Sequence, residues 1–218
     1  MIVIENLYKK FGEVTILNNI NLHIKQGETV ILKGVSGSGK TTLLSIMAGL
    51  DKPSSGKILI DAEPISKLPD AFASKLRAKK IGMIFQHFNL FEHLSVEENV
   101  MIPLVPSGLK QNVIREKVKN ALDLANISHK KSMLASRLSG GEKQRTAIAR
   151  ALVANPNIIL CDEPTANLDK ENSLMFIEIL QELHGQGKTI VVATHDPLFE
   201  YLSFENKVIP MVDGAICE

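Results

Sequence analysis

A glycine-rich stretch that follows an apolar run constrains this sequence most. Gly34–Thr41 reads Gly-Val-Ser-Gly-Ser-Gly-Lys-Thr and fits the pattern G-x-x-x-x-G-K-[ST]. The apolar run Thr29–Leu32 precedes it, and a helical pattern over Thr41–Ala48 follows. Glycines let the backbone wrap closely around phosphate oxygens, and the positive N-terminal end of the helix attracts the same charge. The sequence therefore predicts a strand–loop–helix unit that binds nucleotide phosphates, with Lys40 on the β- and γ-phosphates and Thr41 on Mg²⁺.

Short apolar runs alternate with helical patterns along most of the remaining chain. Ile81–Phe85, Ile158–Cys161 and Thr189–Ala193 are continuous apolar runs like Thr29–Leu32, as is typical of strands buried on both faces of a parallel sheet. Strands that alternate with helices indicate an α/β core.

The middle third of the chain differs, because 88–154 contains no convincing strand pattern. Ser95–Glu98 has the S-x-x-E form of a capping box that opens a short helix. An apolar stripe at helical spacing follows, formed by Ile114, Val118, Ala121, Leu122 and Ala125. We expect an all-helical insertion between two halves of the α/β core.

The charge balance offers no global field that would attract nucleic acid or anionic lipid. The 218 residues include 25 Lys and Arg against 24 Asp and Glu, a net charge of +1. The 2 Cys lie far apart, which suits a reducing compartment. No apolar stretch approaches the roughly 20 residues of a membrane span. We expect a soluble intracellular protein that reaches a membrane only through a partner.

Two adjacent acids end one of the apolar runs, at Asp162 and Glu163. Carboxylates at the tip of a buried strand are costly unless a positive charge lies beside them. Mg²⁺ on a nucleotide would supply that charge, with Asp162 as its ligand and Glu163 polarising the water that attacks the γ-phosphate. A strand that simply ends in solvent would also tolerate the pair. Cys161 fits a small core residue better than a reactive thiol.

A second glycine-rich helix start lies at Leu138–Arg145, which reads Leu-Ser-Gly-Gly-Glu-Lys-Gln-Arg. Ser139, Gly140 and Gly141 open a helix there and form a second anion site. Since the loop at Gly34–Thr41 already surrounds the phosphates, the second site makes sense if it caps a nucleotide bound to another copy of the chain.

These motifs resemble those of the ATP-binding-cassette (ABC) ATPases over essentially the whole sequence, and the Leu-Ser-Gly-Gly-Glu string between the phosphate loop and the strand that ends in Asp162 and Glu163 is among the more specific short signatures known. Further motifs follow in the family's order. Gln86 matches the glutamine that senses Mg²⁺ and the attacking water, and His195 matches the histidine that contacts the γ-phosphate. Asp169 ends the loop, Asn167–Asp169, that crosses the dimer interface. Phe11 lies where the family places an aromatic ring that stacks on adenine, although Tyr is more usual.

The resemblance implies an α/β fold with a P-loop NTPase (RecA-like) core and a parallel sheet, an N-terminal antiparallel β-subdomain and an all-helical insertion. Residues 1–218 would form one nucleotide-binding domain, with 1–86 and 156–218 as the core with the β-subdomain and 87–155 as the helical signature subdomain.

The implied cofactors are ATP and Mg²⁺. The implied catalytic residues are Glu163, His195 and Gln86, and the implied metal ligands are Thr41, Gln86 and Asp162. The implied nucleotide-binding residues are Phe11, Gly34, Ser36, Gly37, Ser38, Gly39, Lys40, Thr41, Thr42, Ser139, Gly140, Gly141, Glu142 and Asp169.

Two partners are implied as well. A second copy would bind head to tail, so that each ATP lies between Lys40 of one copy and Ser139–Gly141 of the other. An integral membrane permease subunit would contact the region Gln86–Leu94. The apolar residues there are candidates for that contact or for internal packing: Phe88, Leu90, Phe91 and Leu94. No nucleic-acid partner is expected, and the protein would be cytoplasmic, peripheral on the inner face of the cell membrane.

Within the family, the chain resembles the group that contains lipoprotein-release, macrolide- and peptide-export and cell-division ATPases. Asp162–Asp169, Thr194–Pro197 and Phe85–Leu90 carry that resemblance, while Ala166 departs from the Gly common in the group. The leading hypothesis is an ATP-hydrolysing subunit that drives a membrane subunit. The alternatives are a regulatory ATPase that transmits a signal without transport and a soluble ATPase that acts on nucleic acid.

Overall fold

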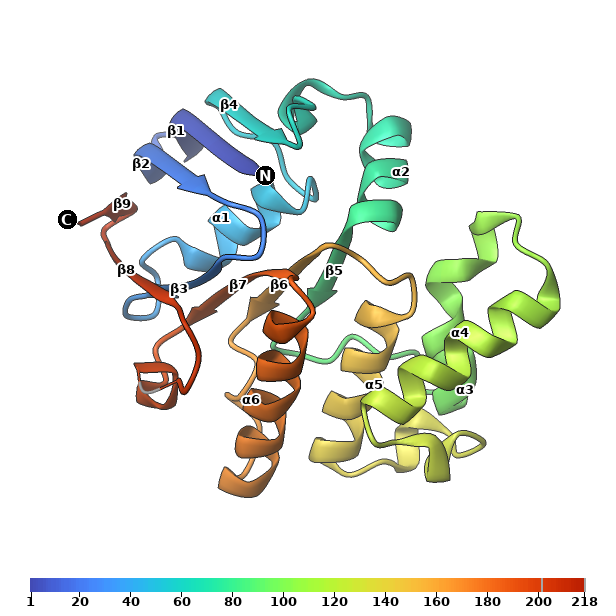
Figure 1. The fold of residues 1–218 in the computed structure, drawn as a ribbon. Coiled ribbons are helices and arrows are strands. Elements are labelled where there is room, and N and C mark those ends of the chain that lie inside the picture. The colour runs from blue at the N-terminus through green and yellow to red at the C-terminus, as the bar shows by residue number, and fades with distance from the viewer. Residues whose placement is uncertain (201, 218) are drawn as a thin grey trace.

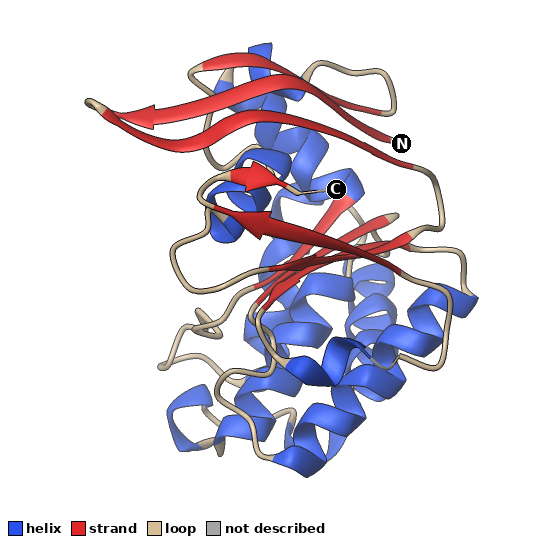
Figure 2. Ribbon diagram, turned by 90° about the vertical axis from the view of Figure 1, so that its left-hand side faces the viewer, coloured by secondary structure: helices blue, strands red, loops and turns tan. Residues whose placement is uncertain are grey.

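A six-stranded sheet forms the centre of the molecule (Figures 1 and 2). The structure is a computed structural model that describes residues 1–200 and 202–217 and, within them, every side chain except that of Lys67. The strand order is β5-β6-β7-β3-β8-β9, parallel throughout except for the last pair. The strands are β3 (Thr29–Lys33), β5 (Ile81–Ile84), β6 (Ile158–Asp162), β7 (Thr189–Thr194), β8 (Lys207–Val212) and β9 (Ala215–Ile216).

Burial of these strands follows their place in the sheet. Every residue of β6 and β7 is buried, as the apolar runs predict. The prediction for Ile81–Phe85 is wrong in part, because β5 ends at Ile84 and only one of its faces is buried. β5 is the edge strand, and Ile81 and Met83 line an open hollow beside Arg77.

A second sheet, antiparallel, lies above the first and matches the expected β-subdomain (Figure 2). It has the order β2-β1-β4, with β1 at Ile2–Phe11, β2 at Val14–Ile24 and β4 at Ser55–Ile60. Helix α1 (Lys40–Met47) buries Leu43, Leu44 and other apolar residues in one cluster with side chains from both sheets. The helix that follows the glycine-rich loop is therefore fixed between two layers.

Helices alone connect β5 to β6 in the described chain, and Figure 1 shows them gathered to one side of the sheet. Their apolar stripe is buried, and Ser95 and Glu98 form the expected capping box. The helices of this stretch are α3 (Val96–Met101), α4 (Gln111–Leu124) and α5 (Gly140–Leu152), with 3₁₀ turns η2 (Ile102–Ser107), η3 (Ser128–Lys130) and η4 (Ala135–Arg137).

The remaining helices cover the sheet or connect its strands. They are α2 (Asp70–Lys80), α6 (Lys170–Gly185) and the 3₁₀ turns η1 (Ile65–Lys67) and η5 (Pro197–Glu200). Among the described residues, none of the helices combines the length and apolar character that a membrane crossing requires.

A buried asparagine organises the turn that leads from β5 into this helical stretch. Asn99 of α3 is fully buried, and its side chain accepts a hydrogen bond from the Phe91 backbone N–H at 2.8 Å. Its amide also donates to the carbonyl oxygens of Phe91 and Ser95, each at 3.0 Å. The turn after Gln86 is therefore held by one side chain that forms these bonds without exposure to water.

We expect Asn99→Ala to lower the free energy of unfolding by about 2 kcal/mol, because it removes the side-chain acceptor of the Phe91 backbone N–H and leaves a cavity at a fully buried position. Chemical denaturation followed by circular dichroism measures the change. Asn120→Ala, at an exposed position of α4, is the matched control and should stay within about 0.5 kcal/mol of the parent. Equal stability of the two variants would contradict this role of Asn99.

Candidate functional site

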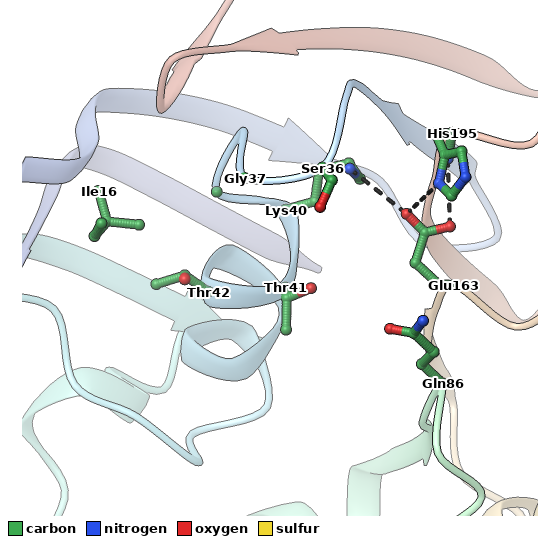
Figure 3. A pocket seen from close by; sticks show the side chains of 10 residues that line it. Ile16, Ser36, Gly37, Lys40, Thr41, Thr42, Gln86, Glu163 and His195 are labelled. Carbon is green, nitrogen blue, oxygen red and sulfur yellow. Dashed lines mark hydrogen bonds and ion pairs between the residues drawn. The ribbon is translucent and has the colours of Figure 1, made fainter. Parts of the chain in front are cut away.

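The glycine-rich loop borders a cavity of about 330 Å³ at the carboxyl end of the parallel strands (Figure 3). Lys40 is 5% exposed, and its Nζ donates to the backbone oxygens of Gly34 at 2.7 Å and Val35 at 3.0 Å. The ammonium is thus held against the loop that precedes it. The cavity is lined by Ile16, Ser36, Gly37, Gly39, Lys40, Thr41, Thr42, Gln86, Glu163 and His195.

Close packing requires glycine at two positions of this loop. A Cβ on Gly34 would lie 2.4 Å from the Met211 backbone oxygen, which is closer than real Cβ contacts. Gly39 has a φ of +95° and lies against Leu17 of β2. The loop can therefore lie against both sheets only with glycine at these positions.

Asp162, at the end of β6, lies beside the start of α1. Thr41 Oγ1 donates to Asp162 Oδ1 at 2.9 Å. Burial raises the pKa of the Asp162 carboxyl, and the Glu163 charge raises it further, while the Thr41 hydrogen bond and the Lys40 charge oppose the shift. The pair offers one hydroxyl and one carboxylate, which are oxygen donors of the kind that Mg²⁺ prefers.

Glu163 lies at the centre of a set of polar contacts between β6 and β7 (Figure 3). Its Oε1 is 2.9 Å from His195 Nδ1 and 3.6 Å from Lys40 Nζ. Its Oε2 accepts from Thr194 Oγ1 at 3.1 Å. The residue has a φ of +43°, the left-handed region that side chains other than glycine rarely adopt. This unusual backbone turns the carboxylate into the cavity.

Gln86 also lines the cavity, from the bend that follows β5. Asn167 Nδ2 donates to the Gln86 backbone oxygen at 2.9 Å, so a hydrogen bond connects the segment after Glu163 to this bend. Beyond Gln86, Phe91 is 48% exposed, whereas Phe88, Leu90 and Leu94 are half-buried. Leu90 packs against the core, so internal packing accounts for part of this set.

The second glycine-rich helix start does not line this cavity. Ser139 is the N-cap of α5, and it forms a capping box with Glu142. The Ser139 backbone N–H lowers the pKa of the Glu142 carboxyl, and the Lys130 ammonium at 3.2 Å acts in the same direction. Ser139, Gly140, Gly141 and Glu142 are absent from the residues that line the cavity.

Five other predicted residues also lie outside the lining: Phe11, Gly34, Ser38, Asp162 and Asp169. Phe11 is 56% exposed rather than packed in the core, and Lys9 Nζ lies 4.6 Å from its ring centroid. Asp169 is the N-cap of α6. Gly34 and Ser38 belong to the loop but do not line the cavity. The Ser38 hydroxyl is buried without a hydrogen-bond partner among the described residues. Ile16 lines the cavity although no sequence motif includes it, and Thr194, which the sequence indicates only as part of Thr194–Pro197, contacts Glu163.

The sequence of this chain matches a known family and several similar proteins. The family model described as "ABC transporter" matches residues 17–166. A macrolide export ATP-binding/permease protein of Campylobacter jejuni is 44% identical over 99% of this chain, which spans 33% of that protein. The chain thus spans about a third of the length of such relatives. An uncharacterized ABC transporter ATP-binding protein, YknY of Bacillus subtilis, is 38% identical over 99% of this chain and 95% of its own.

The structural comparison agrees. The ATP-binding cassette MJ0796, described as dimeric and in a post-hydrolysis state bound to ADP and Pi, has a TM-score of 0.91 and 39% identity, covering 100% of this chain and 97% of its own. The family model covers most of the chain, and relatives and a solved structure match nearly all of it. The chain therefore belongs to the ABC transporter family, as an ATP-binding cassette.

Proposed function

We propose that this chain binds ATP with Mg²⁺ and hydrolyses the ATP, and that it does so as a head-to-tail dimer. One observation carries the proposal. The Lys40 ammonium and the Glu163 carboxylate meet at the edge of a single cavity, beside Gln86 and the glycine-rich loop. A buried cation suits a phosphate group, and a carboxylate beside it suits a water that attacks the phosphate.

The roles of the polar residues follow from their contacts. Lys40 would exchange its two backbone acceptors for phosphate oxygens. Glu163 would orient and polarise the attacking water. His195 Nδ1 contacts the Glu163 Oε1 atom, and the His195 side chain is 63% exposed, so its ring could also contact the γ-phosphate. Gln86 would contact the water and the metal.

The residues present fit Mg²⁺. Thr41 and Asp162 would hold the ion with Gln86, and the ion would neutralise the charge that develops on the phosphates. No cluster of three or more His, Cys, Asp or Glu that could hold a metal occurs among the described residues.

The dimer is supported by the separation of the two anion-binding loops. Ser139–Gly141 does not line the cavity around Lys40, so one chain alone leaves the nucleotide open on one side. A second copy in head-to-tail orientation would bring its Ser139–Gly141 to that side. The similar cassette MJ0796 is described as dimeric with ADP and Pi.

The proposal extends to a membrane subunit of the lipoprotein-release or macrolide- or peptide-export type. Relatives named as macrolide export proteins combine ATP-binding and permease parts in their names. Exposed Phe91 and the hollow lined by His87, Phe88 and Leu90 offer a contact surface near Gln86. The chain would then act in the cytoplasm, on the inner face of the membrane.

Glu163→Gln should reduce ATP turnover at least about 100-fold, because the amide keeps the size of the side chain but cannot accept the proton. It should also trap an ATP-bound dimer. Phosphate release measures turnover, and size-exclusion chromatography with MgATP measures the dimer. Glu116→Gln, at an exposed position of α4, is the matched control and should leave both unchanged. Normal turnover of Glu163→Gln, or a strict monomer at saturating MgATP, would overturn the proposal.

Asp162→Asn should raise the free energy of unfolding of the ligand-free protein at pH 7 by about 1 kcal/mol. Burial raises the pKa of Asp162, so the folded state binds this proton more tightly than the unfolded chain does. The ionised carboxyl therefore lowers the free energy of unfolding as the pH rises above about 4, which is the ordinary pKa of an Asp side chain. Denaturation midpoints of the two proteins should converge at low pH and separate toward neutrality. Mg²⁺-dependent turnover should fall at least about tenfold.

A further inference from the structure

The helix start at Gly140–Gly141 is packed against the start of helix α6. A Cβ built on Gly141 would lie 2.3 Å from Oδ1 of Asn172 and 2.5 Å from its Cγ, so a larger residue there would displace the Asn172 side chain. Asn172 is in the first turn of α6, three residues after the Asp169 N-cap. The glycine at 141 therefore lets the Asn172 amide lie directly on the backbone of α5.

Both polar atoms of the Asn172 side-chain amide form hydrogen bonds. Oδ1 accepts from Arg145 Nη1 at 2.7 Å, and Arg145 lies one turn beyond Gly141 on α5. Nδ2 donates to both carboxylate oxygens of Asp169, at 2.9 and 3.0 Å. Both partners are charged, and hydrogen bonds to charged groups are the stronger ones. Asn172 thus joins the signature helix to Asp169.

Helix capping alone does not explain this arrangement. Asp169 already caps α6 by accepting the backbone N–H of Asn172 at 2.9 Å. That bond needs no side chain at 172, no glycine at 141 and no arginine at 145. The contacts to Gly141 and Arg145 link α6 to a different helix, and this link accounts for an asparagine at position 172.

We propose that Asn172 is a positioning residue of the ATP-driven dimer. It holds the Gly140–Gly141 backbone and the Asp169 loop as one rigid unit, so that both reach the partner copy's nucleotide together. Asn172 itself touches no substrate. Its contribution is preorganisation, which removes the need to order two separate segments when the dimer closes. The inference rests on the head-to-tail dimer proposed above.

The test uses the full chain in a Glu163→Gln background, where turnover does not consume the ATP. Adding Asn172→Ala should raise the MgATP concentration needed for half-maximal dimer formation at least about tenfold, because the hydrogen bonds to two charged side chains, Arg145 and Asp169, are lost. Sedimentation velocity across an ATP titration measures this. Binding of a fluorescent ATP analogue to the monomer should be unchanged, which a general folding defect would not allow. Asn112→Ala, in the exposed first turn of α4, is the matched control.

Gly141→Ala provides a second measurement through a double-mutant cycle. Its methyl group would displace the Asn172 amide, so Gly141→Ala and Asn172→Ala should damage the same contact. Their combined effect on dimer formation should then be smaller than the product of the separate effects. Effects that multiply fully, or normal dimer formation by Asn172→Ala, would overturn the inference alone. Failure of the Glu163→Gln parent to form a dimer would overturn the proposed function as well.

Discussion

Charged groups buried where the parallel strands end are the constraint on which the site depends. β6, β7 and β3 lie side by side, so Asp162, Glu163, His195 and the loop that leads to Lys40 reach the same edge of the sheet. Lys40 and Asp162 are almost inaccessible to water, and the pKa of Asp162 is raised because its burial is not fully compensated by its neighbours. A ligand that brings both phosphate and a divalent cation would compensate these charges, which is why the same geometry favours both.

Packing within the protein accounts for glycines whose usual explanation is the approach of a phosphate. The Cβ of any other residue at Gly34 would collide with the Met211 backbone oxygen in β8, and at Gly141 it would collide with Asn172. These contacts exist in the chain by itself. Packing of the chain itself therefore favours glycine at both positions. A larger residue at Gly34 would have to displace backbone, whereas at Gly141 it would displace the Asn172 side chain.

The sequence predicts this site well wherever a motif and a strand end coincide. The apolar runs before Asp162 and before His195 placed both residues at one edge, since parallel strands end on the same side. Contacts between distant segments could not be predicted in this way. Ile16 lines the cavity because β2 passes over the glycine-rich loop, and nothing in its own neighbourhood indicates that. Likewise, β5 has the apolar composition of a buried strand, but it lies at the edge of the sheet and one of its faces is only half-buried.

Hydrogen bonds connect the segment from Glu163 to Asn172 both to α5 and to Gln86, so a movement of one of these parts affects the others. The Pro164 backbone oxygen accepts a hydrogen bond from the buried Gln144 of α5 at 2.8 Å. Asn167 Nδ2 donates to the Gln86 backbone oxygen. Helix α5 also binds the turn beyond Gln86, since Arg150 donates to the Phe88 backbone oxygen at 2.6 Å. A force applied by a partner near Phe88 would therefore reach α5 and the Glu163–Asn172 segment together. Because hydrogen bonds join these elements, displacement of one without the others would break several bonds at once, and a concerted movement costs less.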